Sequence, residues 1–297
     1  MEALIQKLLL SLLSLSLLLF YGCGESVYSS AESKTSEEVK QDQLDFDFIS
    51  GKCADVISTY ESLMYSGRKL NDEEIYVYVS SLLNCSGFDI VRGMDSILTT
   101  GGSDIYMTAG ALMGIKTIDM NKSKFLQSQY NKAVYICDNR TQELKAINGQ
   151  LSSNLKSICG LTGIMGTVIN MSSMMLNTSG GGASVLELSE VGFKELSDNI
   201  VPEIAGQSLT SYLSQEHTFL ESLNNSLTLG EDGANEIGSL MGQSDFGSVI
   251  GGLAKKLRDP KTNRITEESL INYIETEFGL KIPNLPVPPL PPIPPIP

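Results

Sequence analysis

Apolar residues recur every three or four positions along most of the chain, a spacing that places them on one face of a helix. The first clear case is Cys53–Met64, and Gly67 interrupts the pattern. Asn71 and Glu74 then have the spacing of a capping box at the start of a second helix. A third apolar stripe follows over 90–98. The N-terminal third of the folded chain is therefore predicted to be helical.

The same spacing continues to the end of the folded part. It predicts helices over 105–115, 125–137, 151–169, 185–196, 204–223, 246–257 and 266–278. Asn121 is the expected N-cap of the second of these, and Thr266 and Gly279 are expected to begin and end the last. The pattern thus predicts an all-α, multi-helix domain over 46–280, with the glycine-rich segment 178–183 as the best place for an internal boundary.

The segment 157–186 contains no charged residue. Gly160, Gly163 and Gly166 share one helical face, where glycine allows a neighbouring backbone to approach closely. Two interpretations follow: a central buried helix, which we favour, or a segment that touches lipid or lines an apolar ligand pocket. The residues expected to line such a pocket are Ile158, Leu161, Met165 and Met171.

The N-terminal segment has the features of an export signal. Leu8–Phe20 is apolar but shorter than the roughly 20 residues that span a bilayer, so 1–22 is interpreted as a signal peptide. The Gly22-Cys23 pair that follows resembles the lipobox of bacterial lipoproteins, although Phe20 and Tyr21 differ from the residues that the family prefers. The resemblance implies that Cys23 is lipidated and anchors the protein to a membrane; the alternatives are an ordinary secreted protein cut nearby and an uncleaved anchor. By resemblance to the sorting rule of lipoproteins in enteric bacteria, Gly24 after the cysteine implies the outer membrane rather than the inner.

The segments at the two ends differ in composition from the helical domain. Residues 23–45 are polar, with little to bury, and should form a disordered tether. Residues 281–297 are rich in proline from Pro283 onwards and predict a polyproline II tail. The helical domain would then lie between a lipid tether and an extended tail.

Four cysteines follow Cys23, namely Cys53, Cys85, Cys137 and Cys159. In an exported protein they are expected to form disulfides. The midpoint of the first two falls in the polar turn 67–71, and that of the last two at the Asn148-Gly149 turn signal. Residues equidistant from the turn of a helical hairpin lie side by side, so sequential pairing is expected. The alternative is four free, buried thiols.

An internal repeat connects the first and third apolar stripes at an offset of 34 residues. The matched positions are Ile57, Tyr60, Leu63, Met64 and Gly67 in the first copy and Val91, Met94, Ile97, Leu98 and Gly101 in the second. This period resembles that of the tetratricopeptide repeat. The resemblance covers about one and a half repeats, and a third copy fails at Ser128 and Asn131. It implies TPR-like hairpins that present a face to another protein, with Tyr60 and Tyr76 as candidate surface residues.

The net charge and the types of reactive side chain argue against several classes of function. The net charge of −14 argues against nucleic acid as a partner. The chain has one histidine, His217, and no nucleophile elbow, metal-ligand spacing or phosphate loop. The loop that begins at Asp259 matches a calcium-binding loop at Asn263, but Lys261 occupies a ligand position. We therefore expect no enzyme activity, no cofactor and no metal.

Two functions fit these observations. The first is an envelope lipoprotein, facing the periplasm or the cell surface, whose TPR-like domain is a protein-interaction scaffold. The second is a periplasmic binding or transport-accessory module with a small apolar ligand in a pocket lined by 157–186. TPR-containing periplasmic lipoproteins have the same general plan. An open pocket along Ile158–Met175 would favour the second function, and a packed centre with an apolar groove near Tyr60 and Tyr76 the first.

Overall fold

A computed structural model gives the arrangement of the chain. It describes residues 43–44, 47–48, 50–89, 104–179, 184–215, 218–240, 246–280 and 282. The chain divides into two compact units, 1–50 and 51–297. In the first unit Gln43 Nε2 donates a hydrogen bond to Asp47 Oδ1 (2.9 Å). The helices and strands described below belong to the second unit.

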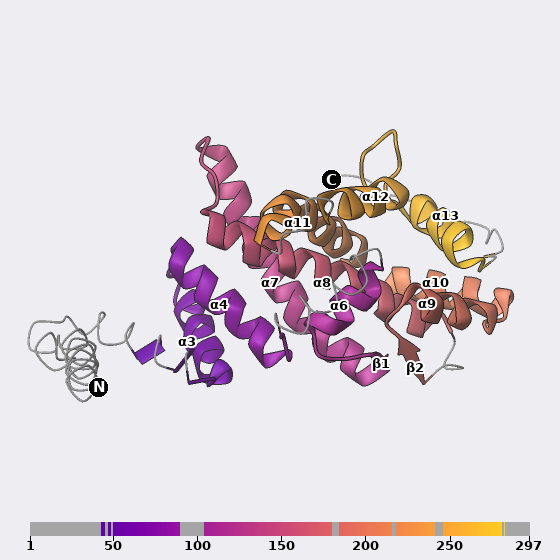
Figure 1. Ribbon diagram of the computed structural model, residues 1–297, viewed down its shortest axis with the longest axis horizontal. Coiled ribbons are helices and arrows are strands. Elements are labelled where there is room, and N and C mark those ends of the chain that lie inside the picture. The colour runs from indigo at the N-terminus through magenta and orange to yellow at the C-terminus, as the bar shows by residue number, and fades with distance from the viewer. Residues whose placement is uncertain are drawn as a thin grey trace, which may run out of the picture. The chain divides into compact units, whose positions relative to one another are not determined.

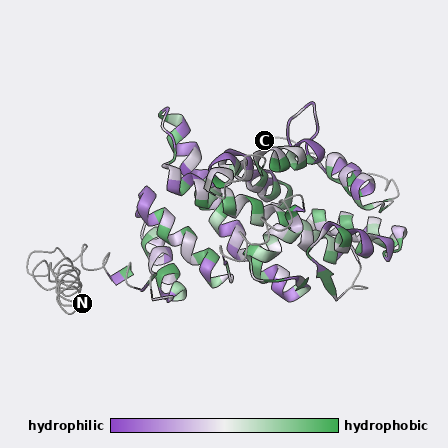
Figure 2. Ribbon diagram, viewed as in Figure 1, coloured by the Kyte–Doolittle hydropathy of each residue, from purple (hydrophilic) through white to green (hydrophobic). Residues whose placement is uncertain are grey.

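The described part of the second unit is all-α, which confirms the predicted fold class: it contains ten helices and one pair of short strands (Figure 1). The elements are α3 (Cys53–Tyr65), α4 (Asp72–Cys85), α6 (Ile105–Leu112), β1 (Thr117–Asp119), α7 (Met120–Ala146), α8 (Ser153–Thr178), β2 (Val185–Glu187), α9 (Glu190–Asp198), α10 (Pro202–Gln215), α11 (Phe219–Leu240), α12 (Phe246–Leu257) and α13 (Glu267–Phe278). In Figure 2 most helices carry hydrophobic and hydrophilic residues side by side, as expected for helices with one buried face.

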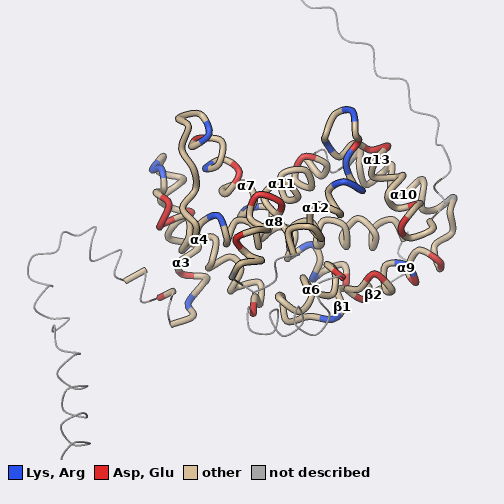
Figure 3. Tube along the Cα trace, turned by 45° about the horizontal axis from the view of Figure 1, so that its top comes forward, with Lys and Arg blue, Asp and Glu red and all other residues tan. Residues whose placement is uncertain are grey.

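Helix α8 is the centre of the fold. It packs against α4, α6, α7, α10, α11 and β2, and Figure 3 shows it as a tube with almost no charged residue. By length and composition it could span a membrane, and it is the only such helix in the described ranges. Its most hydrophobic window of 18 residues is, however, 100% buried inside the protein. The favoured interpretation of 157–186 as a central buried helix is therefore confirmed for its helical part.

Glycines bring the backbones of α8 and α11 together. A Cβ added at Gly160 would lie 2.7 Å from the Cα of Gly233. A Cβ added at Gly163 would overlap the backbone of Gly230 and Ser226. The expected close approach along α8 is confirmed, and its partner is the later helix α11.

Two helical hairpins are each closed by a disulfide. Cys53 of α3 pairs with Cys85 of α4, and Cys137 of α7 pairs with Cys159 of α8, with a Cα–Cα distance of 5.7 Å in both. The turns lie where they were predicted, with positive φ at Gly67 (84°) and at Asn148 (55°). Sequential pairing is therefore confirmed, and the alternative of four free thiols is wrong.

The strand pair is a correction to the sequence analysis. β1 and β2 pair antiparallel, with Ile118 opposite Leu186, so the helix predicted over 185–196 begins only at Glu190, with Ser189 as its N-cap. Helix α7 likewise begins at Met120 with Asp119, rather than Asn121, as its N-cap. Each strand has three residues, which is too short for an alternating pattern to be recognised.

The helix predicted over 204–223 is also wrong as a single element. The structure has α10 ending at Gln215 and α11 beginning at Phe219 and continuing to Leu240. The second half of α11 contains Gly230, Gly233 and Gly238, and glycine has a low helix propensity. Packing against α8 stabilises this half, and a local pattern cannot reveal such a contact.

The C-terminal helices follow the prediction. α12 covers 246–257 as expected, Thr266 caps α13 with a capping box, and Gly279 ends it with a φ of 76°. Between the two helices, Asp259 and Arg264 form an isolated β-bridge. The Asn224 amide accepts a hydrogen bond from Ile265 N (2.7 Å) and donates one to Ile265 O (3.0 Å). This contact fastens the loop to α11.

Candidate functional site

Several sequence-based predictions concern residues outside the described ranges. They are the signal peptide and Cys23, the tether up to residue 42, the third stripe over 90–98, His217, most of the glycine-rich segment 178–183, and the tail from Pro283. They stay predictions. The second half of the TPR-like repeat belongs to this group, so the described residues contain only its first helical hairpin.

The two tyrosines expected on a partner surface differ in exposure. Tyr60 is 0% exposed and its ring packs edge to face with that of Tyr78, at a centroid distance of 6.1 Å. Tyr76 is 36% exposed. Tyr60 is therefore a core residue, which corrects the prediction, because its side chain fills the interior of the α3–α4 hairpin. Only Tyr76 can take part in a surface.

The apolar residues expected to line a pocket on α8 are also in the core. Ile158, Leu161, Met165 and Met171 are all buried. The sulfur of Met165 accepts a hydrogen bond from the hydroxyl of Tyr130 (3.3 Å). None of these four lines any cavity reported below, so the structure gives them a packing role and corrects their assignment as pocket residues.

A network of neutral polar side chains connects α7, α8 and α10, and the sequence analysis missed it. Gln127 Nε2 donates to Asn170 Oδ1 (2.9 Å) and to the Tyr212 hydroxyl (3.2 Å). Asn170 Nδ2 donates to Asn131 Oδ1 (3.2 Å), and Ser173 Oγ donates to Gln127 Oε1 (3.1 Å). The polar residues within an otherwise apolar helix were the available signal. The network satisfies buried polar groups and fixes the rotation of α8.

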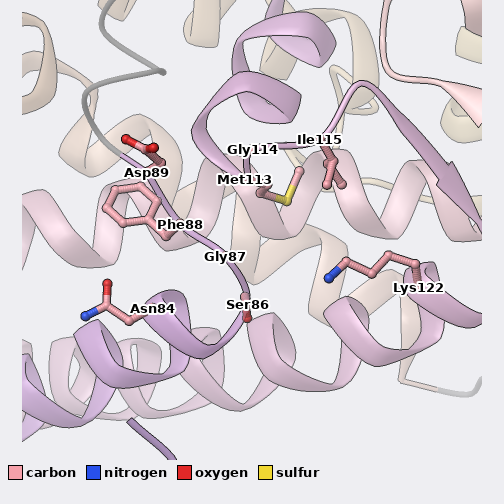
Figure 4. A pocket seen from close by; sticks show the side chains of 9 residues that line it. All are labelled: Asn84, Ser86, Gly87, Phe88, Asp89, Met113, Gly114, Ile115 and Lys122. Atoms are coloured by element: carbon pink, nitrogen blue, oxygen red, sulfur yellow. The ribbon is translucent and has the colours of Figure 1, made fainter. Parts of the chain in front are cut away.

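A cavity of about 640 Å³ lies between the end of α4 and the segment that follows α6 (Figure 4). Asp89 N donates to Leu112 O (2.6 Å) and holds the residues after α4 against α6. Lys122 enters the cavity from α7, across from Phe88 and Asp89. Its ammonium lies 5.4 Å from the ring centroid of Phe125, close enough for a cation–π contact. The cavity thus offers one cation and one carboxylate, without a pairing of nucleophile and base.

A smaller cleft of about 140 Å³ lies where the α3–α4 hairpin meets α7. Its apolar lining residues are Met64, Leu70, Ile75 and Ile136. Charged residues flank it: Arg140 pairs with Asp72 (2.6 Å), and Lys69 and Arg140 both pair with Glu143 (2.8 and 3.2 Å). The hydrogen bonds from Lys69 and Arg140 lower the pKa of the Glu143 carboxyl. Tyr76 follows Ile75 in α4 but does not itself line this cleft.

A third cavity, of about 360 Å³, lies at the closed end of the α7–α8 hairpin. Cys159 is the one residue of 157–186 that lines it. Lys145 and Asp232 approach to 3.9 Å across it, and Lys156 forms an ion pair with Glu236. The disulfide partner of Cys159 is buried in the core. The cavity therefore contacts this disulfide only on its Cys159 side.

Metal-binding geometry is not found among the described residues, where no group of three or more His, Cys, Asp or Glu side chains could hold an ion. In the loop after α12, the Asp259 carboxylate accepts hydrogen bonds from Lys261 N (2.8 Å) and the Thr262 hydroxyl (3.2 Å). These are the bonds of a local turn.

Comparison with protein-family models, with curated proteins and with solved structures finds no match for this chain. Its class is therefore defined by its own features: an all-α domain around a buried helix, with two hairpins closed by disulfides.

Proposed function

We propose that the protein is an exported lipoprotein whose helical domain is a protein-interaction scaffold in a bacterial cell envelope. One observation carries the proposal. Of the five cysteines, four form two disulfides within hairpins, and Cys23 is the one left over. It directly follows a small residue at the end of an apolar run, as in the lipobox.

The two disulfides support export, because such bonds persist in oxidising compartments and are rare in the cytosol. A free cysteine that serves as the lipid attachment point needs no protein partner. Residues 24–45 would then hold the domain away from the membrane. Gly24 in place of an aspartate favours the outer membrane.

The scaffold part of the proposal is supported by the packed interior. Helix α8 is covered by the helices packed around it. The packed interior therefore does not support a ligand site along Ile158–Met175. The remaining candidate is the exterior of the α3–α4 hairpin, which carries the exposed Tyr76 and, through Met64, Leu70 and Ile75, part of the apolar cleft. A partner side chain inserted into this cleft would meet an apolar floor and charges of both signs.

Lipid labelling tests the anchor. Cells that produce the protein are fed an alkyne fatty acid, and the protein is then examined for the label and for its membrane fraction. We expect label on the wild type, none on Cys23→Ala, and unchanged label on the Cys53→Ala/Cys85→Ala double variant. An unlabelled wild type would overturn the anchor.

Site-specific photocrosslinking in intact cells tests the scaffold. A photoreactive amino acid at Tyr76 should give one discrete adduct with another envelope protein. The same probe at Val201, which is exposed just before α10, should give none. Equal adduct patterns at the two positions, or none at either, would contradict a partner site on the α3–α4 hairpin.

A further inference from the structure

The two disulfides differ in how much of their surface is open to solvent. Cys137 and Cys159 are 0% and 1% exposed. Cys159 lines the cavity at the closed end of the α7–α8 hairpin, but almost none of its surface is accessible to water. Cys53 and Cys85 are both half-buried instead. A thiol in solution therefore has access to the first disulfide that the second does not offer.

The residues that flank the first disulfide in sequence leave room for another molecule to approach. Lys52 and Ala54 beside Cys53 are exposed, and so are Asn84 and Gly87 close to Cys85. Cys53 is the first residue of α3 and Cys85 the last of α4. The disulfide thus lies at the open end of the α3–α4 hairpin, at its surface.

Few other contacts hold α3 at this end. The helix packs mainly against α4, and its buried residues are Val56 and Tyr60. The ring of Tyr60 packs against that of Tyr78. The neighbouring Glu61 accepts hydrogen bonds from the Tyr78 hydroxyl (3.4 Å) and from Lys132 Nζ (2.8 Å). These contacts lie about two helical turns beyond the disulfide. The start of α3 is therefore held chiefly by Val56 and by the disulfide.

We propose that the Cys53–Cys85 disulfide is a thiol-exchange site. A protein dithiol, in which two cysteine thiols lie close together, reduces this pair in the folded protein, while Cys137–Cys159 stays oxidised. Reduction releases the start of α3 from the end of α4 and leaves the packing around α8 unchanged. The proposal goes beyond the scaffold function and does not depend on lipid at Cys23.

The reaction transfers two electrons from the dithiol to the disulfide. A thiolate is stabilised at the N-terminus of a helix, where Cys53 lies, and not at the C-terminus, where Cys85 lies. One thiolate of the dithiol therefore attacks Cys85 Sγ, the Cys53–Cys85 bond breaks, and Cys53 leaves as the thiolate. The second thiolate of the dithiol then attacks the first and releases Cys85. The dithiol ends as a disulfide, and its two protons pass to Cys53 and Cys85.

The test uses the oxidised full-length protein in detergent, with dithiothreitol as the probe. Samples taken over time are quenched with acid and alkylated, and the peptides that contain each pair are quantified by mass spectrometry. Cys53–Cys85 should be reduced at least about tenfold faster than Cys137–Cys159, because the buried pair reacts only after the core opens. In guanidinium chloride, which unfolds the chain, the two rates should agree within about twofold.

Equal rates in the folded protein, or faster reduction of Cys137–Cys159, would overturn the proposal. A difference in rate that persists unchanged in guanidinium chloride would overturn it too, because the fold could not be its cause. With glutathione as a monothiol probe, the mixed disulfide trapped by acid should lie on Cys85. A mixed disulfide on Cys53 alone would overturn the assignment of the attacked sulfur.

Hydrogen exchange tests the release of α3. Protein in which only Cys53 and Cys85 have been reduced and alkylated is compared with the oxidised protein. The Cys53→Ser/Cys85→Ser variant is the matched form without added alkyl groups. In both, the amides of residues 56–59 should exchange at least about tenfold faster, and those of α8 should be unchanged. Unchanged exchange over 56–59, or faster exchange throughout α8, would overturn a release that is confined to the start of α3.

Discussion

At the scale of single residues, the missing side chains of a few glycines determine how the core is assembled. Gly160 and Gly163 on α8 face Gly230 and Gly233 on α11, with backbone against backbone. Close contact of this kind gains dispersion energy along both helices, and it requires that no Cβ is present at the crossing. The glycines lower the helix propensity of each segment, so the contact stabilises helices that would be weak alone.

Gly163→Ala should therefore destabilise the protein strongly. The new methyl group would overlap the backbone of Gly230 and Ser226, which cannot move without separating the helices. We expect a loss of about 3 kcal/mol or more in the free energy of unfolding, measured by denaturant titration. Gly251→Ala in α12 is the control: nothing lies within 4 Å of its added Cβ, so it should stabilise by about 0.5–1 kcal/mol. Similar effects of the two substitutions would contradict the close crossing.

Asn224 is a second residue whose side chain holds distant segments together. Its amide bonds both the N–H and the C=O of Ile265, and donates as well to Leu220 O (2.8 Å). Asn224→Ala would leave a buried N–H without an acceptor and should cost about 2–3 kcal/mol. Hydrogen exchange should show faster exchange at Ile265. Asn199→Ala, which removes one exposed side-chain bond to Glu195 O, should change the free energy of unfolding by less than about 0.5 kcal/mol.

At the scale of elements, each disulfide lies within one hairpin and none links the two in the described part of the chain. The closed loops span 32 and 22 residues. In the loop-entropy model, loops of this size stabilise by about 3–4 kcal/mol each. The α3–α4 hairpin is joined to α7 by apolar packing and by ion pairs, which are individually weak when exposed.

Replacing both cysteines of a pair by alanine should thus lower the free energy of unfolding by about 3–4 kcal/mol for either hairpin. The two losses in the free energy of unfolding should add in the fourfold variant, because each disulfide restricts a different part of the unfolded chain. Denaturant unfolding of the four proteins under equal conditions measures this. A fourfold variant no less stable than either double variant would contradict this additivity. It would show that the two disulfides act on one cooperative element.

The sequence predicted those elements that are determined locally. Asn71 with Glu74, and Thr266 with Gly279, marked helix ends correctly because capping depends on a few adjacent residues. The disulfide pairs followed from symmetry about a turn. In contrast, β1 and β2 exist through pairing between residues far apart in the chain, and the second half of α11 is stabilised by α8.

The predictions of site residues were the poorest. Tyr60 and Met165 are apolar residues at helical spacing, and such a pattern predicts the core rather than a surface.

At the scale of the whole molecule, tightly packed tyrosines limit stability at high pH. Burial raises the pKa of Tyr106, Tyr130 and Tyr273 well above the value of 10.0 that they have when exposed. The unfolded chain therefore loses these protons first as the pH rises. Stability from the three groups is complete below pH 10 and falls above it, by about 1.4 kcal/mol per pH unit for each tyrosine.

Rapid alkaline titration should accordingly show two classes among the 11 tyrosines. Tyr106, Tyr130 and Tyr273 should ionise only in a cooperative step that coincides with loss of helical circular dichroism. Tyr130→Phe should reduce the pH dependence of the free energy of unfolding by the contribution of one tyrosine. Ionisation of all 11 in a single non-cooperative phase would contradict the packing of these rings.

The buried amides of Asn170 and Asn224 have a consequence for producing the protein. Both belong to Asn-x-Ser sequons, Asn170-Met171-Ser172 and Asn224-Asn225-Ser226, and a eukaryotic secretory pathway attaches glycans to such sites. A sugar on Asn170 would displace Gln127 from its hydrogen bond, and one on Asn224 would separate Ile265 from α11. A glycan at either site could not be accommodated in this fold. A secretion host that forms disulfides but does not glycosylate asparagine, such as the bacterial periplasm, suits this chain.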